Sequence, residues 1–143
     1  YWDANARGAL LGLSRGTNKA HIVKATLDAQ AYQTRDLLDA MEQDSDVSLK
    51  EMRVDGGLVV NDYIVQKIAD IADLKISKPV NSEATAWGAA AMAGLGTGVF
   101  NELRDVNNLW EEKRSFTPQI DNVDRDFEYN GWLEAVSRVR TTV

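Results

Sequence analysis

The sequence is poor in the residues that most often build metal sites and covalent cross-links. It has no cysteine and a single histidine, His21, among 143 residues. The absence of cysteine excludes disulfides and thiolate metal ligands, and one histidine does not favour a histidine-based metal site. We therefore predict no metal site in this chain. We expect His21, near the start of a predicted helix, to have a structural role.

Two further absences bear on location and partners. No run of about eighteen apolar residues occurs, and no positively charged segment leads into an apolar one, so the sequence predicts neither a membrane span nor a signal peptide. The net charge of −6 comes without a basic patch, which argues against nucleic-acid binding. We therefore expect a cytoplasmic protein with no nucleic-acid partner and no membrane partner.

Hydrophobic periodicity predicts an α/β fold. Apolar residues recur in steps of three and four in helices and alternate with polar residues in strands. A strand near 52–54, a helix at 62–72 and a strand at 74–80 form a predicted βαβ unit with parallel strands. The second strand is expected to carry its apolar side chains on one face, at Leu74, Ile76 and Val80.

Two amphipathic helices are predicted at the sides of this unit. The first runs from about Lys19 to Gln43, behind the cap residue Asn18. The last runs from about 128 to 142, and it is expected to bury one apolar face. That face consists of Trp132, Ala135, Val136 and Val139.

The segment between the second strand and the last helix divides into two parts. Residues 82–95 are mostly alanine and glycine, which predicts a helix that packs closely against its neighbours. Glycine costs a helix about 1 kcal/mol relative to alanine, so Gly88 is expected at a close backbone approach or beside a ligand. Residues 100–127 are charged and show no clear period, and we expect them to be irregular.

The paired glycines Gly56 and Gly57 are the most informative local feature. They stand between the extended run 53–55 and the helix predicted from Asp62. A residue without a Cβ lets the backbone turn sharply and approach a ligand, and the first N–H groups of a helix offer donors to a phosphate. The same pair also suits a plain connection between a strand and a helix, so the pattern alone leaves both interpretations open.

A second motif lies upstream of the glycines. Residues 8–13 have the pattern G-x-L-x-G-L, and residues 21–28 have the pattern H-I-x-x-A-T-L-D. With the spacer between them, they resemble the C-terminal signature of the FGGY carbohydrate kinases at every specified position. Within that family, the segments 15–18, 31–36 and 53–57 resemble the glycerol kinases. The resemblance covers essentially the whole chain.

The resemblance implies a fold and a place within it. FGGY kinases consist of two ribonuclease H-like domains of the actin type, with ATP and the polyol in the cleft between them. Residues 1–143 correspond to a C-terminal FGGY kinase domain, namely the second half of the second ribonuclease H-like domain without its first strands. We therefore expect part of a ribonuclease H-like, actin-type ATPase domain, in which helices flank the parallel βαβ unit.

The resemblance also implies site residues. Gly57 would lie against the phosphates of ADP, Gly56 would shape the turn, and Asn61 would hydrogen-bond the adenosine. The alternative for Asn61 is a pure helix cap. Asp62 stands where the family usually has a second asparagine, and Leu58 is bulkier than the usual small residue. Both departures lie close to the expected nucleotide.

The expected function follows from the same resemblance. The cofactors would be ATP or ADP and Mg²⁺, but the catalytic aspartate, the Mg²⁺ ligands and the polyol-binding residues lie in sequence that this chain lacks. No catalytic residue is therefore assigned, and the chain alone is expected to be inactive. The parent protein would phosphorylate glycerol to glycerol 3-phosphate.

The partners and the alternatives are also set by the resemblance. The partners of this chain would be ATP, glycerol and the remainder of the kinase chain, and a homo-oligomer is expected because a sheet without its first strands has an open edge. One alternative is another FGGY kinase, acting on a pentulose, gluconate or a larger polyol. The other is a non-catalytic interaction module.

Overall fold

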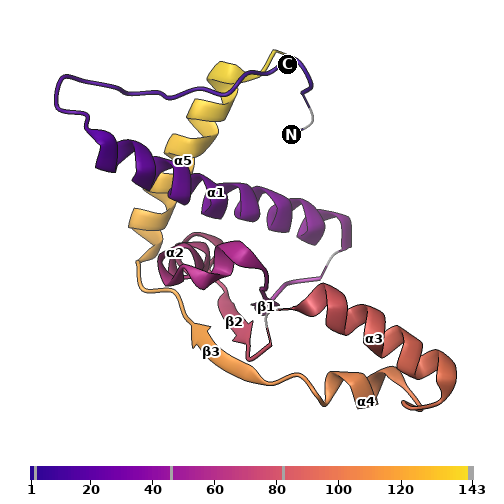
Figure 1. Cartoon of the computed structure of the whole chain (residues 1–143). Coiled ribbons are helices and arrows are strands. Elements are labelled where there is room, and N and C mark those ends of the chain that lie inside the picture. Colours follow the sequence, from indigo (N-terminus) through magenta and orange to yellow (C-terminus); the bar gives the residue numbers. More distant parts are fainter. Residues whose placement is uncertain (2, 46, 82, 142–143) are drawn as a thin grey trace.

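The protein is a mixed α/β structure in which helices cover one face of a small sheet (Figure 1). The computed structural model describes residues 1, 3–45, 47–81 and 83–141. Within these residues, no helix is both long and apolar enough to cross a membrane. The elements in chain order are α1 (Lys19–Ser45), β1 (Glu51–Arg53), the 3-10 helix η1 (Gly57–Val60), α2 (Asp62–Ala72), β2 (Lys75–Pro79), α3 (Ala84–Thr97), α4 (Leu103–Asn107), β3 (Glu112–Phe116) and α5 (Asn122–Val139).

The sheet has the strand order β1-β2-β3. β1 and β2 are parallel and are joined through α2, which confirms the predicted βαβ unit and the α/β class. β3 runs antiparallel to β2, so that Ile76 of β2 lies between Met52 and Phe116. The face that carries these three side chains turns toward α2.

The core lies between the sheet, α2 and α1 (Figure 1). α2 is apolar on two sides, because one side faces the sheet and the other faces α1. Its side chains Ile64, Val65 and Ile71 are at most 3% exposed. Ile76 from β2 and Ala31 from α1 complete the contact, and both are fully buried.

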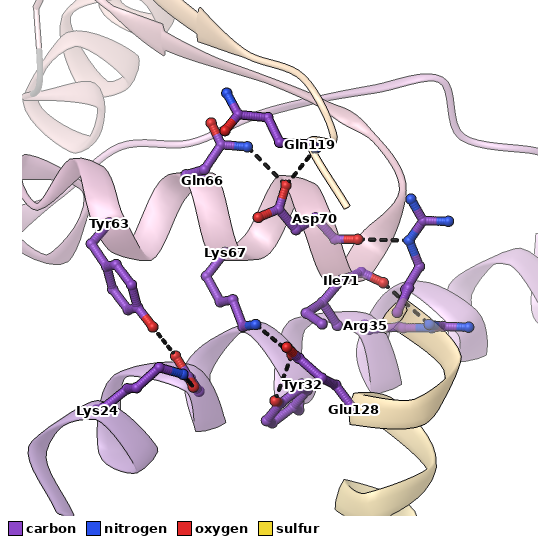
Figure 2. Close-up of polar contacts among 12 residues, drawn as sticks. Lys24, Tyr32, Arg35, Tyr63, Gln66, Lys67, Asp70, Ile71, Gln119 and Glu128 are labelled. Atoms are coloured by element: carbon purple, nitrogen blue, oxygen red, sulfur yellow. Dashed lines mark hydrogen bonds and ion pairs between the residues drawn. The ribbon is translucent and has the colours of Figure 1, made fainter. Parts of the chain in front are cut away.

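Charged side chains connect α1, α2 and α5 beside this core (Figure 2). Lys67 of α2 pairs with Glu128 of α5, and the same carboxylate accepts a hydrogen bond of 3.0 Å from the Tyr32 hydroxyl of α1. Nearer the start of α1, the Asp28 carboxylate accepts bonds of 2.5 Å from both Lys24 and Tyr63. A buried charge is tolerated when it is paired and hydrogen-bonded. The bonds to Glu128 and the bond from Tyr63 to Asp28 therefore link α1 to α2 and α5.

Several predicted boundaries are confirmed. α1 begins behind Asn18, whose Oδ1 accepts hydrogen bonds from the amides of Ala20 and His21, and it ends at Ser45. β2 runs from Lys75 to Pro79, one residue shorter at each end than the predicted strand at 74–80, and Val80 lies outside it and is 58% exposed. The prediction that Val80 shares the buried face of the strand is therefore wrong.

The prediction of an irregular segment at 100–127 is wrong. The segment contains α4, the strand β3 and the first turn of α5, which begins at Asn122 behind the cap Asp121. β3 escaped prediction because it is an edge strand whose sequence Glu-Lys-Arg-Ser-Phe buries only Phe116. An edge strand with one buried side chain has no alternating apolar signal.

The last helix differs from the prediction in which residues it buries. Arg125 and Tyr129 are its buried residues. The Arg125 guanidinium donates a 2.6 Å bond from Nε to the carbonyl of Asp70, and Tyr129 donates a 2.6 Å bond to Asp36. The expected apolar face is only half-buried, at Trp132, Ala135, Val136 and Val139. Thr142, the expected helix end, lies outside the described residues.

α3 does not pack as predicted. Residues 84–90 are exposed, and α3 and α4 project away from α1 and α2 (Figure 1). The close approach occurs at Gly94 rather than at Gly88, because a Cβ at Gly94 would lie 2.6 Å from Cδ2 of Phe100, whereas a Cβ at Gly88 meets nothing within 4 Å. Ser82, the expected first residue of this helix, lies outside the described residues.

Candidate functional site

The segment between β1 and α2 is an exposed turn at the carboxyl end of β1. Gly56 has φ 93° and ψ −178°, a combination that is essentially confined to glycine. The 3-10 helix η1 follows at once, and of its residues only Val59 is buried. A Cβ built on Gly56 or on Gly57 meets no atom within 4 Å. The space above the paired glycines is therefore open to a ligand.

Asn61 connects η1 to α2. Its backbone amide donates a 3.2 Å bond to the carbonyl of Leu58, and its side-chain Oδ1 accepts a 3.0 Å bond from the amide of Tyr63. The cap interpretation of Asn61 is therefore confirmed. The cap uses only the carboxamide oxygen, so the amide NH₂ group can serve a different partner.

Three charged side chains meet next to this turn. Asp62, in the first turn of α2, pairs through Oδ1 with Lys78 of β2 at 2.8 Å and through Oδ2 with Arg114 of β3. The hydrogen bond from Lys78 lowers the pKa of the Asp62 carboxyl group. The carboxyl ends of the parallel strands β1 and β2 and the start of β3 lie together at this end of the sheet. Two cations and one carboxylate therefore lie beside the open turn.

A third basic residue, Arg53, lies at the same end of the strands. Arg53, the last residue of β1, stacks its guanidinium over the Trp110 ring at 4.0 Å and donates a 3.1 Å bond from Nη1 to Oδ1 of Asn107. Both partners belong to the segment that was expected to be irregular. No pattern in the sequence indicates Arg114, Trp110 or Asn107 at this position, because they are 50 or more residues away from the glycine pair.

The predicted site residues Gly56, Gly57 and Asn61 lie in one continuous turn, and their contact with a nucleotide stays a prediction. Open backbone at a sheet edge followed by a helix start is suited to bind a phosphate group. In the part of the chain that the structure describes, no group of three or more acidic or histidine side chains forms a metal site. His21 lies elsewhere, and its Nδ1 accepts a 3.2 Å bond from the amide of Asn18, as expected for a structural role.

An apolar groove lies along α1, and its described lining includes no residue of the turn. It has a volume of about 870 Å³ and runs between the segment 7–13, the first half of α1 and α5. Leu10 and Leu13 are more than half exposed. The groove also exposes apolar atoms of the two helices, and its lining includes Ile22, Trp132, Val136 and Val139. Such a surface is typical of a protein interface.

Sequence comparison identifies relatives for nearly the whole chain. Residues 1–97 match the C-terminal domain of the FGGY family of carbohydrate kinases. A glycerol kinase of Shewanella pealeana is 51% identical over 140 residues, which cover 98% of this chain and 28% of that protein. A glycerol kinase of Haemophilus influenzae is 49% identical over 138 residues, which cover 96% of this chain and 27% of that protein. The chain thus spans less than a third of the length of these relatives.

Solved structures show the same fold. The Plasmodium falciparum glycerol kinase crystallised with ADP superposes with a TM-score of 0.85 at 29% identity, over 99% of this chain and 28% of that protein. A Brucella ovis xylulose kinase superposes with a TM-score of 0.81 at 22% identity, over 95% of this chain and 28% of that protein. The predicted actin-type ATPase fold is confirmed by these neighbours. The chain belongs to the FGGY family of carbohydrate kinases.

Proposed function

We propose that the chain is the nucleotide-binding C-terminal part of a glycerol kinase, which transfers the γ-phosphoryl group of ATP to glycerol. The observation that carries this proposal is the degree of identity. The glycerol kinases of Shewanella pealeana and Haemophilus influenzae are 51% and 49% identical to nearly the whole chain. A gluconate kinase and a xylulose kinase of the same fold are only 20% and 22% identical. Glycerol is therefore the best-supported acceptor.

The proposed role of this chain is to form one wall of the nucleotide site. Gly57 would approach the phosphates, Gly56 would shape the turn, and the amide of Asn61 would bind the adenosine. The exposed turn supports this role, as does the ADP complex of the Plasmodium falciparum relative. Mg²⁺, bound with the nucleotide, would neutralise the charge that develops on the phosphates. Its ligands and the catalytic base would come from the rest of the kinase.

The remainder of the kinase is the proposed partner of the exposed apolar surfaces. Residues 1–143 would form the second half of the second ribonuclease H-like domain. The preceding part of that domain would pair with the free edge of β1 and cover α3. Apolar surface that stays exposed in the parent protein, such as the groove along α1, would suit a homo-oligomer. We place the parent protein in the cytoplasm.

The proposal is tested with the full-length kinase that contains this chain. The enzyme is supplied with ATP and Mg²⁺ and with glycerol, xylulose or gluconate in turn, and product formation is measured for each acceptor. We expect turnover with glycerol and its close analogues alone. A preference for xylulose or gluconate would keep the family and change the substrate. No turnover with any acceptor would favour a non-catalytic interaction module.

The proposed contact of Asn61 with the adenosine can be separated from its role as a helix cap. Asn61→Ala removes the cap and the amide, and loss of a cap costs about 1 kcal/mol of stability. Asn61→Ser keeps a good cap and removes only the amide. We expect both variants of the full-length kinase to bind ADP about three- to tenfold more weakly, as is typical of one lost hydrogen bond.

Calorimetric ADP titration and thermal unfolding decide between the two roles of Asn61. The nucleotide contact requires that Asn61→Ser melts like the unsubstituted enzyme and still binds ADP more weakly. If Asn61→Ser binds ADP normally, Asn61 is only a cap, and the proposed adenosine contact is wrong.

A further inference from the structure

The three charged side chains at the edge of the sheet form a defined cluster, which we call the Asp62 clamp: Asp62, Lys78 and Arg114. Lys78 and Arg114 are direct cross-strand partners in the register of β2 and β3. Two like charges in such a pair repel each other and destabilise the pairing. Asp62 reaches both cations, with one carboxylate oxygen on each. The carboxylate therefore allows this strand pairing to carry two positive charges.

Both cations of the clamp also contact the ring of Phe116, a buried residue of the core. The Lys78 ammonium group lies 5.8 Å from the centre of the Phe116 ring, and the Arg114 guanidinium lies 4.7 Å from it. Phe116 is 5% exposed, and the Lys78 side chain is 14% exposed. An aromatic face attracts cations within about 6 Å. The ring and the carboxylate thus hold both cations in place from two sides.

The turn next to the clamp has few contacts of its own. Leu58 is 61% exposed and Val60 is 75% exposed, so that Val59 is the only buried side chain of η1. The position of the turn therefore depends on its two ends. At the first end, the amide of Val54 donates a 3.1 Å bond to the carbonyl of Ser77. At the second end, Asp62 ties the first turn of α2 to two strands.

We propose that Asp62 is a positioning residue for nucleotide binding, because its ion pairs with Lys78 and Arg114 hold the Gly56–Asn61 turn in its ligand-ready position. This inference rests on the proposed function. It does not require Asp62 to touch the nucleotide. A turn that is already ordered loses less conformational entropy when the ligand binds, and its affinity is correspondingly higher.

The competing effect of Asp62 has the opposite sign. A carboxylate next to bound phosphates repels them, so its neutralisation alone would strengthen nucleotide binding. Positioning predicts weaker binding when the carboxylate is removed. The direction of the change therefore distinguishes the two effects.

The test compares Asp62→Asn with Asp62→Glu in the full-length kinase. Exposed ion pairs contribute up to about 1 kcal/mol each, so we expect Asp62→Asn to raise the Kd for ADP and the KM for ATP about three- to tenfold. The KM for glycerol and kcat should stay within about twofold of the unsubstituted enzyme. Asp62→Glu keeps the charge and can still reach both cations, so it should restore most of the affinity. Tighter ADP binding in Asp62→Asn would overturn the proposal.

A mutant cycle isolates the clamp from general effects on stability. In a Lys78→Met, Arg114→Met background the clamp is already lost, so we expect that Asp62→Asn no longer weakens ADP binding there. Any remaining change should be toward tighter binding, because the unpaired carboxylate repels the phosphates. An equal effect in both backgrounds would overturn the proposal. Glu134→Gln is the matched control, because it removes the exposed pair with Arg138 on α5, and it should leave ADP binding unchanged.

Failure of this inference can be distinguished from failure of the proposed function. The clamp alone would be rejected if the unsubstituted full-length enzyme phosphorylates glycerol and the Asp62→Asn variant has the same KM for ATP as that enzyme. Unsubstituted enzyme that neither binds ADP nor phosphorylates an acceptor would reject the proposed function, and with it the clamp.

Discussion

The isolated chain of 143 residues is expected to show no ATP-dependent phosphorylation of glycerol, whereas the full-length kinase is expected to be active. Phosphoryl transfer is catalysed almost entirely by positioning the reactants and by stabilising charge with metal ions and cationic groups. The described residues of this chain contain no group of acidic or histidine side chains that could hold Mg²⁺. They supply an open turn, which we propose as part of the nucleotide site, and the catalytic base is expected in the rest of the kinase.

This expected loss is complete rather than partial, because the groups that are absent act together. A nucleotide wall without metal and base can bind ADP, but it cannot bring a hydroxyl group in line with the γ-phosphate. The measurement is glycerol 3-phosphate formation by the chain, purified from a host whose own glycerol kinase has been deleted. The full-length enzyme from the same host is the positive control. Turnover by the chain that co-elutes with it would contradict this account.

The local elements were predictable where the sequence carries a clear period. The helices α1 and α2 follow from apolar residues in steps of three and four, and the turn follows from Gly56 and Gly57. β3 was not predictable, because its only buried side chain is Phe116 and its pairing is with a strand more than 30 residues earlier. Periodicity reports burial, and an edge strand has little of it.

The candidate site shows the same limit. The sequence indicates Gly56, Gly57 and Asn61 because they are neighbours in the chain. In the sequence, Asp62 stands out only as a departure from the usual asparagine. Its partners, Lys78 and Arg114, are distant in the chain and are brought beside it by the sheet. The structure shows that this carboxylate is paired with two cations. It does not enter the site as an uncompensated negative charge, so the departure is compatible with phosphate binding.

In helix α3 the sequence pattern and the packing within this chain differ. Its small side chains indicate a close contact, yet within this chain residues 84–90 are exposed. A surface so poor in side-chain volume fits a neighbour that approaches closely, and the relatives are more than three times as long as this chain. The sequence pattern reports the packing that we propose for the full domain, rather than the packing that this chain achieves alone.

Substitution of the two glycines is expected to separate the shape of the turn from its contact with the ligand. Gly56 has φ 93° and ψ −178°, which an alanine adopts only at a cost of about 1–3 kcal/mol. Gly56→Ala in the full-length kinase should therefore lower the melting temperature or displace the turn, and it should weaken ADP binding by about ten- to hundredfold.

Gly57 is the matched position, because its φ lies outside the left-handed region and a Cβ there meets no atom within 4 Å. Gly57→Ala should leave the melting temperature of the free enzyme unchanged. If Gly57 lies against the phosphates, the added methyl group occupies their space, and ADP binding should weaken as strongly as in Gly56→Ala. Thermal unfolding without ligand and calorimetric titration with ADP measure the two effects separately. Normal ADP binding by Gly57→Ala would show that the phosphates do not approach this residue. Normal stability and normal ADP binding by Gly56→Ala would show that the turn does not need its glycine conformation.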